Sequence, residues 1–169
     1  DESNTEMINY EGRYFPKSYM LNINADDPET ISQIMFNTYD RETSKIKKSK
    51  NSQVISEDTA LKIASIIQRE AGGKHDMNLI SGIIWNRIFA GMKLQMDATL
   101  QYAKGTEEIW WPRVKSEDKY IDSLYNTYLH KNLPPSPIAN PGINAITAAY
   151  NPQKTKCMYY IHDKYSKIH

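Results

Sequence analysis

One glutamate stands out because of the helix face on which it is expected to lie. Glu70 follows Ile63, Ile66 and Ile67 by seven, four and three residues, so all four side chains fall on one face of a helix. Burial of this face removes water from a charged carboxylate, and the negative end of the helix dipole, within a turn of Gly72, repels an anion. Both effects raise the pKa of Glu70. A carboxyl group that keeps its proton near neutral pH can act as a general acid.

Two other roles for Glu70 stay open at this point. Most acidic residues in helices are solvated charges on the protein surface. A buried ion pair, for instance with Arg87, would lower the pKa of Glu70 instead of raising it. Helix periodicity alone does not decide among the three roles.

Several polar and aromatic side chains are suited to binding a ligand. Residues 125–128 (Tyr-Asn-Thr-Tyr) offer two rings, an amide and a hydroxyl, which suit stacking on a sugar and holding its N-acetyl group. The alternative is a loop that packs its own side chains. Asn140, before Pro141, is ordinarily a turn residue.

The sequence gives no reason to expect a metal or a cofactor. His75, His130, His162 and His169 lack ligand spacing such as i, i+4. Cys157 is the single cysteine of the chain, which excludes an internal disulfide and a cysteine-based zinc site.

Charge and hydropathy exclude further classes of partner. The 169 residues include 21 Lys and Arg against 20 Asp and Glu, a net charge of +1, so there is no overall field for nucleic acid. The longest apolar runs are far shorter than the roughly 20 residues that cross a bilayer. Residues 45–50 hold four lysines, which form either a solvated helix end or a patch for phosphates or headgroups.

Apolar spacing predicts a helical hairpin around the candidate acid. Ser56 is a favourable N-cap for the helix that carries Glu70, which should end at Gly72 and Gly73. A second helix should begin after an Asp76 cap and stop at Gly91. Other helices are expected from an Asp27 cap to the mid-forties, over residues 99–104 and over residues 143–150.

Two further segments are predicted to be irregular or extended. Residues 122–142 hold four of the eight prolines and are too long for a simple connector, which favours a functional loop. Residues 157–162 and 165–169 have the composition of two strands, in a hairpin that turns at Asp163 and Lys164.

Several strings of the sequence, in their order along the chain, resemble the endolytic murein transglycosylases (the MltG or YceG-like family). The resemblance covers roughly residues 10–168, nearly the whole chain. The strings are residues 11–16 (EGRYFP), 64–71 (ASIIQREA), 85–88 (WNRI), 91–97 (GMKLQMD), 125–128 (YNTY) with 133–135 (LPP), and 138–142 (IANPG).

This resemblance implies an enzyme that cuts glycan strands of peptidoglycan internally, between N-acetylmuramic acid and N-acetylglucosamine, without adding water. Glu70 matches the family's catalytic glutamate. By that analogy it protonates the glycosidic oxygen and then receives the proton of the muramyl C6 hydroxyl as a 1,6-anhydro ring closes. Ordinary glycosidases need a second carboxyl group, whereas here one serves both steps.

The resemblance also bears on the other candidate residues. It favours substrate contacts for Asn126 and Tyr128, and it makes Gln95 and Asn140 candidates for hydrogen bonds to the substrate. Asp97 is the only other acid within a matching motif. It either stabilises positive charge on the sugar or caps the helix that follows, and we favour the cap.

Three positions depart from the family pattern. Ala98 stands where proline is common, and Asn132 and Ser136 stand where glycine is common. These differences affect the shape of the loops, so they put the subsite preference in doubt.

Together these observations predict an α+β domain with a helical core, a small antiparallel sheet from the terminal segments, and a lysozyme-like active-site groove walled by residues 92–142. Residues 1–9 should be frayed. The resemblance implies that residues 1–55 retain at most the edge of a LysM-like subdomain and that residues 56–169 form the catalytic domain. It also implies a position at the periplasmic face of the cytoplasmic membrane, with an N-terminal anchor outside this sequence.

The expected partners are peptidoglycan glycan strands, with peptidoglycan synthases as further candidates and no nucleic acid. Three rival readings stay open. They are a hydrolase of the same glycans that uses water, a non-catalytic peptidoglycan-binding or scaffolding module, and anion binding by residues 45–50.

Overall fold

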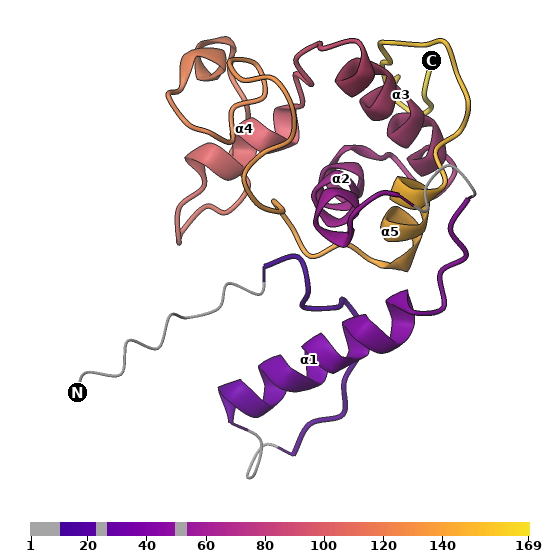
Figure 1. Ribbon diagram of the computed structural model, residues 1–169. Coiled ribbons are helices and arrows are strands. Elements are labelled where there is room, and N and C mark those ends of the chain that lie inside the picture. Colours follow the sequence, from indigo (N-terminus) through magenta and orange to yellow (C-terminus); the bar gives the residue numbers. More distant parts are fainter. Residues whose placement is uncertain (1–10, 23–26, 50–53) are drawn as a thin grey trace, which may run out of the picture.

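The regular structure of the chain is helical (Figure 1). The computed structural model describes residues 11–22, 27–49 and 54–169, so the prediction of a frayed segment over residues 1–9 lies outside the described residues. In chain order the elements are α1 (Pro28–Thr43), α2 (Glu57–Glu70), α3 (Met77–Phe89), α4 (Asp97–Lys104), the short 3-10 helix η2 (Ser116–Tyr120) and α5 (Ile143–Tyr150). Among the described residues, no helix combines the length and the apolar character that a bilayer crossing requires.

Helix α2 lies at the centre of the molecule and contacts α3, α4 and α5 (Figure 1). Ser56 caps it as predicted, because its hydroxyl accepts a hydrogen bond from the Thr59 N–H at 3.1 Å. Its apolar stripe, which includes Ile63, Ile66 and Ile67, is fully buried against these neighbours. Burial of this stripe fixes the rotation of α2 and therefore the direction in which Glu70 points.

The predicted ends of the other helices agree closely with the structure. Asp27 caps α1 by accepting a hydrogen bond from the Thr30 N–H at 2.7 Å, and α5 covers the predicted residues 143–150. Helix α3 ends just before Gly91, whose φ of +63° is the left-handed conformation typical of a helix stop. Helix α4 begins two residues earlier than predicted, at Asp97.

Asp76 precedes α3 as predicted, but its side chain does not cap the helix. The carboxylate is fully buried and contacts two histidines instead, His75 at 3.0 Å and His162 at 3.1 Å. An N-cap pattern predicts the position of a helix end, whereas the partner of the capping side chain depends on distant residues such as His162.

The predicted α+β class is wrong, because the described residues contain no small antiparallel sheet. The segments 157–162 and 165–169 meet at one isolated bridge, between His162 and Ile168. Their backbones pair around it, with reciprocal hydrogen bonds between Ile161 and His169 at 3.1 and 2.9 Å. This short turn does not continue into a ladder.

Helix α3 takes part of the place of a neighbouring strand, because its side chains bind backbone carbonyl oxygens at the start of the C-terminal segment. The Asn86 amide donates to the carbonyl oxygens of Thr155 and Cys157 at 3.0 and 2.9 Å. Arg87 donates to the carbonyl oxygen of Met158. These side chains bind three carbonyl groups that a neighbouring strand would otherwise pair with, which is consistent with an extended sequence pattern that does not produce a sheet here.

The N-terminal segment packs onto the helical core across the expected domain boundary. The Asn140 side-chain oxygen accepts hydrogen bonds from the backbone N–H groups of Gly12 and Tyr14, at 2.8 and 3.0 Å, and Phe15 is buried in the core. Arg13 forms an ion pair with Glu57 of α2 at 2.9 Å. Residues 11–15 are therefore in direct contact with the helices that follow.

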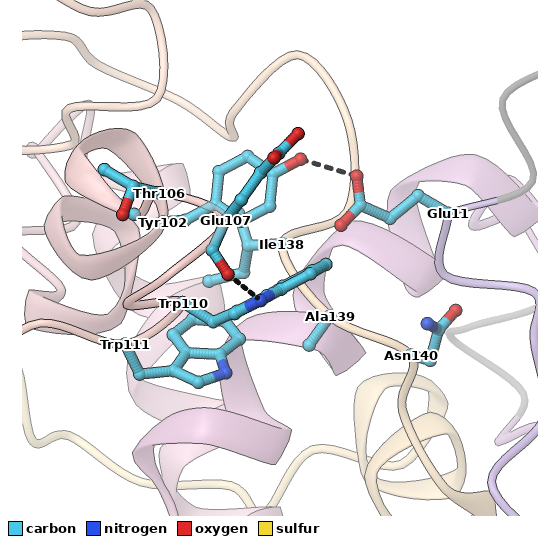
Figure 2. Close-up of a pocket in the computed structure, with 10 residues that line it drawn as sticks. Glu11, Tyr102, Thr106, Glu107, Trp110, Trp111, Ile138, Ala139 and Asn140 are labelled. Atoms are coloured by element: carbon cyan, nitrogen blue, oxygen red, sulfur yellow. Dashed lines mark hydrogen bonds between the residues drawn. The ribbon is translucent and has the colours of Figure 1, made fainter.

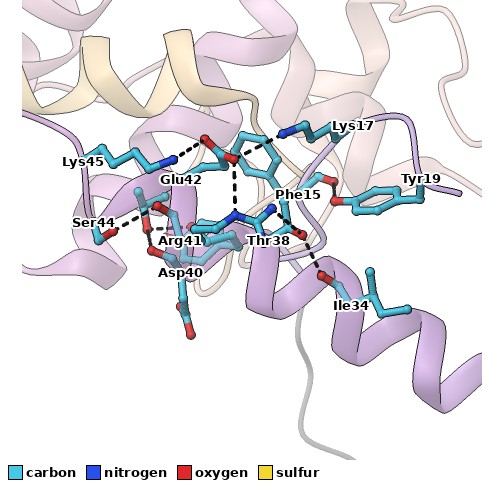
Figure 3. Close-up of polar contacts among 12 residues, drawn as sticks. Phe15, Lys17, Tyr19, Ile34, Thr38, Asp40, Arg41, Glu42, Ser44 and Lys45 are labelled. Atoms are coloured by element: carbon cyan, nitrogen blue, oxygen red, sulfur yellow. Dashed lines mark hydrogen bonds and ion pairs between the residues drawn. The ribbon is translucent and has the colours of Figure 1, made fainter.

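The lysine-rich segment makes contacts with its own neighbours. Figure 3 shows Glu42 of α1 between Lys17 and Lys45, with nitrogen to oxygen distances of 3.2 and 3.4 Å. The Lys48 ammonium lies 4.2 Å from the centre of the Tyr150 ring. The Lys17 contact joins the N-terminal segment to α1, the Lys45 contact is local, and the Lys48 contact joins the segment after α1 to α5. Lys50 lies outside the described residues.

The contact between α3 and the segment after α5 yields a test of the fold. A Cβ atom added at Gly82 would lie 2.2 Å from the carbonyl oxygen of Gln153, so Gly82→Ala must push the two segments apart. Alanine in a helix interior ordinarily stabilises by about 1 kcal/mol relative to glycine. We expect Gly82→Ala to lower the free energy of unfolding by about 1–3 kcal/mol instead, measured by urea denaturation.

Gly91→Ala is the matched control for this substitution. No atom lies within 4 Å of its added Cβ, and its cost of about 1 kcal/mol comes from the positive φ alone. If Gly82→Ala were stabilising, the close packing of residue 153 on α3 would be contradicted.

Candidate active site

Glu70 is the last residue of α2, and its half-buried side chain lines a cavity of about 350 Å³. The cavity lies where the end of α2, the start of α4 and the loop before η2 come together. Its lining residues are Arg69, Glu70, Asp97, Ala98, Gln101, Arg113 and Val114. Five of these come from within residues 92–142, the stretch expected to wall the site.

Both oxygens of the Glu70 carboxyl group have hydrogen-bond partners. Oε1 accepts the backbone N–H of Ala98 at 3.0 Å, and Oε2 accepts the hydroxyl of Tyr160 at 2.8 Å. Ala98 lies in the first turn of α4, so the positive end of that helix faces the carboxylate. The group is held in one orientation by two segments that are distant in sequence.

The pKa of Glu70 is raised above its ordinary value. The largest cause is burial, which penalises the charged form, and the nearby charge of Asp97 acts in the same direction. The hydrogen bonds from Ala98 and Tyr160 and the proximity of His162 lower the pKa but do not offset the burial. This is the direction that a proton donor near neutral pH requires.

The ion pair with Arg87 considered from the sequence is not formed. Arg87 is buried, and its guanidinium donates to the carbonyl oxygens of Leu94 and Met158. Arg87 thus serves to hold backbone segments around α3, and the Glu70 pKa is not lowered by a paired cation.

Asp97 lies close to Glu70 and is bound by Tyr128. It is the first residue of α4, and its carboxylate accepts a hydrogen bond from the Tyr128 hydroxyl at 2.6 Å. The residue at the N-cap position is Met96, and the carboxylate that accepts a first-turn N–H of α4 belongs to Glu70. Glu70, Asp97 and Tyr128 therefore gather at one end of α4.

The structure places Asn126 inside its own loop. It is fully buried, and its amide donates to the carbonyl oxygens of Lys119 and Ile121 at 3.2 and 2.8 Å. Its side-chain oxygen accepts the N–H of Tyr128 at 2.9 Å. These bonds shape the loop that presents Tyr128. A contact of Asn126 with substrate stays a prediction.

Gln95 and Asn140 lie outside the residues that line the Glu70 cavity. Gln95 is exposed with a φ of +51°, and its N–H donates to the carbonyl oxygen of Thr127 at 3.0 Å. Asn140 holds the N-terminal segment and lines a second, neighbouring cavity. Their predicted contacts with substrate are not tested by this arrangement.

Sequence reasoning missed Tyr160, Arg69 and Arg113. Tyr160 reaches Glu70 from 90 residues away along the chain, in a segment predicted to be a strand. The Arg69 guanidinium lies 3.7 Å from the centre of the Trp111 ring, so a residue next to Glu70 is fixed by the loop after α4. No spacing rule reveals contacts of this range.

Three of the histidines contact acidic side chains. His75 and His162 meet at Asp76, and His169 contacts Asp163 at 3.2 Å. In the described ranges, no group of three or more His, Cys, Asp or Glu side chains is arranged to hold a metal ion.

The raised pKa of Glu70 predicts a pH-dependent effect of Glu70→Gln on stability. Between the ordinary pKa of an unfolded glutamate and the raised pKa of Glu70, the folded state binds more protons than the unfolded state, so stability falls as pH rises through this window. Glutamine removes this loss. The variant should therefore gain stability relative to the parent from about pH 4 upwards, measured by urea unfolding across pH.

Glu29→Gln, an exposed position in the first turn of α1, is the matched control for removal of a carboxylate. The raised pKa would be contradicted if the stability of Glu70→Gln relative to the parent stayed constant with pH or fell as pH rises.

Comparison with known proteins identifies relatives of this chain. The model of the YceG-like family matches residues 1–169. The chain is 35% identical over 155 residues to an endolytic murein transglycosylase of Bacillus subtilis, covering 89% of this chain and 41% of the relative. It is 29% identical over 155 residues to an endolytic murein transglycosylase of Streptococcus pneumoniae, covering 90% of this chain and 28% of that relative.

The fold has a solved counterpart as well. The crystal structure of a YceG-like protein from Listeria monocytogenes superposes with a TM-score of 0.86 at 31% identity, over 95% of this chain and 52% of that chain. The present chain spans less than half the length of the curated relatives. With the whole sequence matched by the family model and the fold shared at this identity, the chain belongs to the YceG-like family.

Proposed function

We propose that this chain is a lytic transglycosylase, a carbon–oxygen lyase that cleaves the bond between N-acetylmuramic acid and N-acetylglucosamine within peptidoglycan glycan strands. The observation that carries the proposal is Glu70, a carboxyl group with a raised pKa that is held by two hydrogen bonds at the edge of a cavity. The names of the curated relatives, which are endolytic murein transglycosylases, support the choice of substrate.

In the first step Glu70 acts as the general acid. It donates its proton to the glycosidic oxygen while the bond from that oxygen to C1 of the muramyl residue breaks. The electron pair of the bond remains on the leaving oxygen, and positive charge develops on the muramyl ring. The Asp97 carboxylate, which accepts the Tyr128 hydroxyl and whose charge acts on Glu70, would favour that positive charge.

In the second step the same carboxylate acts as the base. The muramyl C6 hydroxyl attacks C1, and its proton passes to Glu70, which regenerates the acid and leaves a 1,6-anhydro ring. The Ala98 N–H and the Tyr160 hydroxyl stabilise the carboxylate that exists between the two steps. A single carboxyl group therefore completes the cycle with no water consumed.

The surroundings of the reaction form part of the same proposal. We expect residues 56–169 to form the catalytic unit, with residues 1–55 as the edge of a LysM-like subdomain. Cleavage would take place at the periplasmic face of the cytoplasmic membrane, beside peptidoglycan synthases, with the protein held by an N-terminal anchor. The murein named for the relatives supports a place at the cell wall.

The direct test of catalysis is Glu70→Gln incubated with purified sacculi. Glutamine cannot donate the proton, so release of glycan fragments should fall by at least about 100-fold while the fold is retained. Mass spectrometry of the parent's products in ¹⁸O-labelled water should give anhydro ends without the label. Glu29→Gln should match the parent in rate.

Other outcomes of this test would favour the rival functions. Reducing ends that carry ¹⁸O would identify a hydrolase that uses water. Full activity of Glu70→Gln would remove Glu70 from the reaction, and failure of the parent to cleave any sacculi would favour a non-catalytic binding module.

Tyr160→Phe tests the positioning role of the Tyr160 hydroxyl. This hydroxyl stabilises the Glu70 carboxylate, so its removal raises the pKa of Glu70 further. The reaction needs protonated Glu70, and the alkaline limb of the pH–rate profile should therefore shift to higher pH. Tyr120→Phe, an exposed tyrosine on η2, should leave the profile unchanged. A lower rate with an unshifted limb would mean that Tyr160 acts only on the fold.

A further inference from the structure

A second cavity of about 670 Å³ is lined by residues of α4, of the loop after it and of the segment before α5 (Figure 2). Its volume is in the range of ligand-binding pockets. Tyr102 of α4, Trp110, Trp111 and the Ile138–Ala139 backbone turn contribute apolar walls, and Glu11 and Glu107 contribute carboxylates. The mechanism above uses none of these residues.

The two indole rings of this cavity both have contacts, and Trp110 is exposed to solvent whereas Trp111 is half-buried. Trp110 is 71% exposed, and its indole N–H donates to the Glu107 carbonyl oxygen at 3.0 Å, as the dashed line in Figure 2 marks. Trp111 is covered on one face by the Arg69 guanidinium at 3.7 Å. A large aromatic ring that is both exposed and fixed offers a preformed stacking surface at a small entropic cost.

The second cavity and the Glu70 cavity adjoin at this stacked pair. Arg69 lines the cavity of Glu70, and Trp111, which it covers, lines the second cavity. Helix α4 also joins them, because Ala98 binds Glu70 and Tyr102, one turn later and about 6 Å along the axis, lines the second cavity. A chain of sugars that runs from Glu70 past the Arg69–Trp111 pair would reach the second cavity.

The polar groups of the cavity select the chemistry of the ligand. The Glu11 carboxylate accepts the Tyr102 hydroxyl, and Glu107 lies on the loop between α4 and Trp110. Both carboxylates accept hydrogen bonds from hydroxyl groups and repel anions. This disfavours a phosphate polymer or a sugar that bears a carboxylate. It suits a neutral N-acetylhexosamine whose C–H face stacks on an indole.

We propose that this second cavity is a distal subsite of the Glu70 cleft, in which a neutral N-acetylglucosamine unit of the glycan strand stacks on Trp110. The proposal rests on the proposed function. Occupation of the subsite would require a strand that continues beyond the bond being cleaved, so it would favour cleavage within strands over cleavage of short fragments.

The test measures binding separately from cleavage. All binding variants carry Glu70→Gln to prevent turnover, and the probe is a hexamer of N-acetylglucosamine titrated by isothermal calorimetry. Loss of one stacking surface in Trp110→Ala should raise the Kd about three- to tenfold. Trp110→Phe should recover most of the affinity, because it keeps an aromatic face.

Phe89→Ala is the matched control for this experiment. Phe89 is an exposed aromatic residue on α3, which lines a different cavity, and its removal should leave the Kd unchanged. Circular dichroism confirms that each variant is folded. An unchanged Kd for Trp110→Ala, or equal weakening by Phe89→Ala, would overturn the proposal.

Cleavage assays with Glu70 intact separate this proposal from the proposed function. With stem-free glycan strands, Trp110→Ala should lower kcat/KM for long strands and leave the shortest cleavable oligomer unaffected. If Trp110→Ala lowered kcat/KM only for strands that carry peptide stems, the assignment of the subsite to a sugar would be overturned. Trp110-dependent binding of the hexamer in a parent that cleaves nothing would support the subsite while contradicting the proposed function.

Discussion

The site depends on one contact, between the carboxyl group at the end of α2 and the first turn of α4. Glu70 accepts the Ala98 N–H at 3.0 Å, so the negative end of one helix and the positive end of another meet at the same carboxylate. This contact joins the end of α2 to the start of α4 at the edge of the cavity. It also gives the carboxylate a backbone hydrogen-bond donor that belongs to a helix.

Opposing effects set the protonation state of Glu70. Burial and the charge of Asp97 favour the acid, whereas the Ala98 N–H and the Tyr160 hydroxyl favour the carboxylate, and burial prevails. A group that must both donate and accept a proton needs this balance, because a strongly stabilised form would make one of the two steps slow. The stability cost of such a group is typical of functional sites.

Local signals in the sequence predicted the helices well, because caps and stops act over a few residues. The Ser56 and Asp27 caps and the stop near Gly91 have the expected geometry. The buried stripe of α2 likewise predicted the direction of Glu70. The prediction of a sheet was wrong because the C-terminal segment binds Asn86 and Arg87 of α3. A local sequence pattern does not indicate such a distant partner. Tyr160 was missed for the same reason, since it lies 90 residues from the carboxylate that it binds.

The pKa of Glu70, measured in the parent chain by NMR titration of its side-chain carboxyl carbon, tests the central claim most directly. Burial of this carboxyl group predicts a midpoint above that of an ordinary glutamate, despite the hydrogen bonds from Ala98 and Tyr160. A midpoint at or below the ordinary value would mean that the hydrogen bonds outweigh the burial. Glu70 would then be a permanent anion near neutral pH and could not serve as the acid.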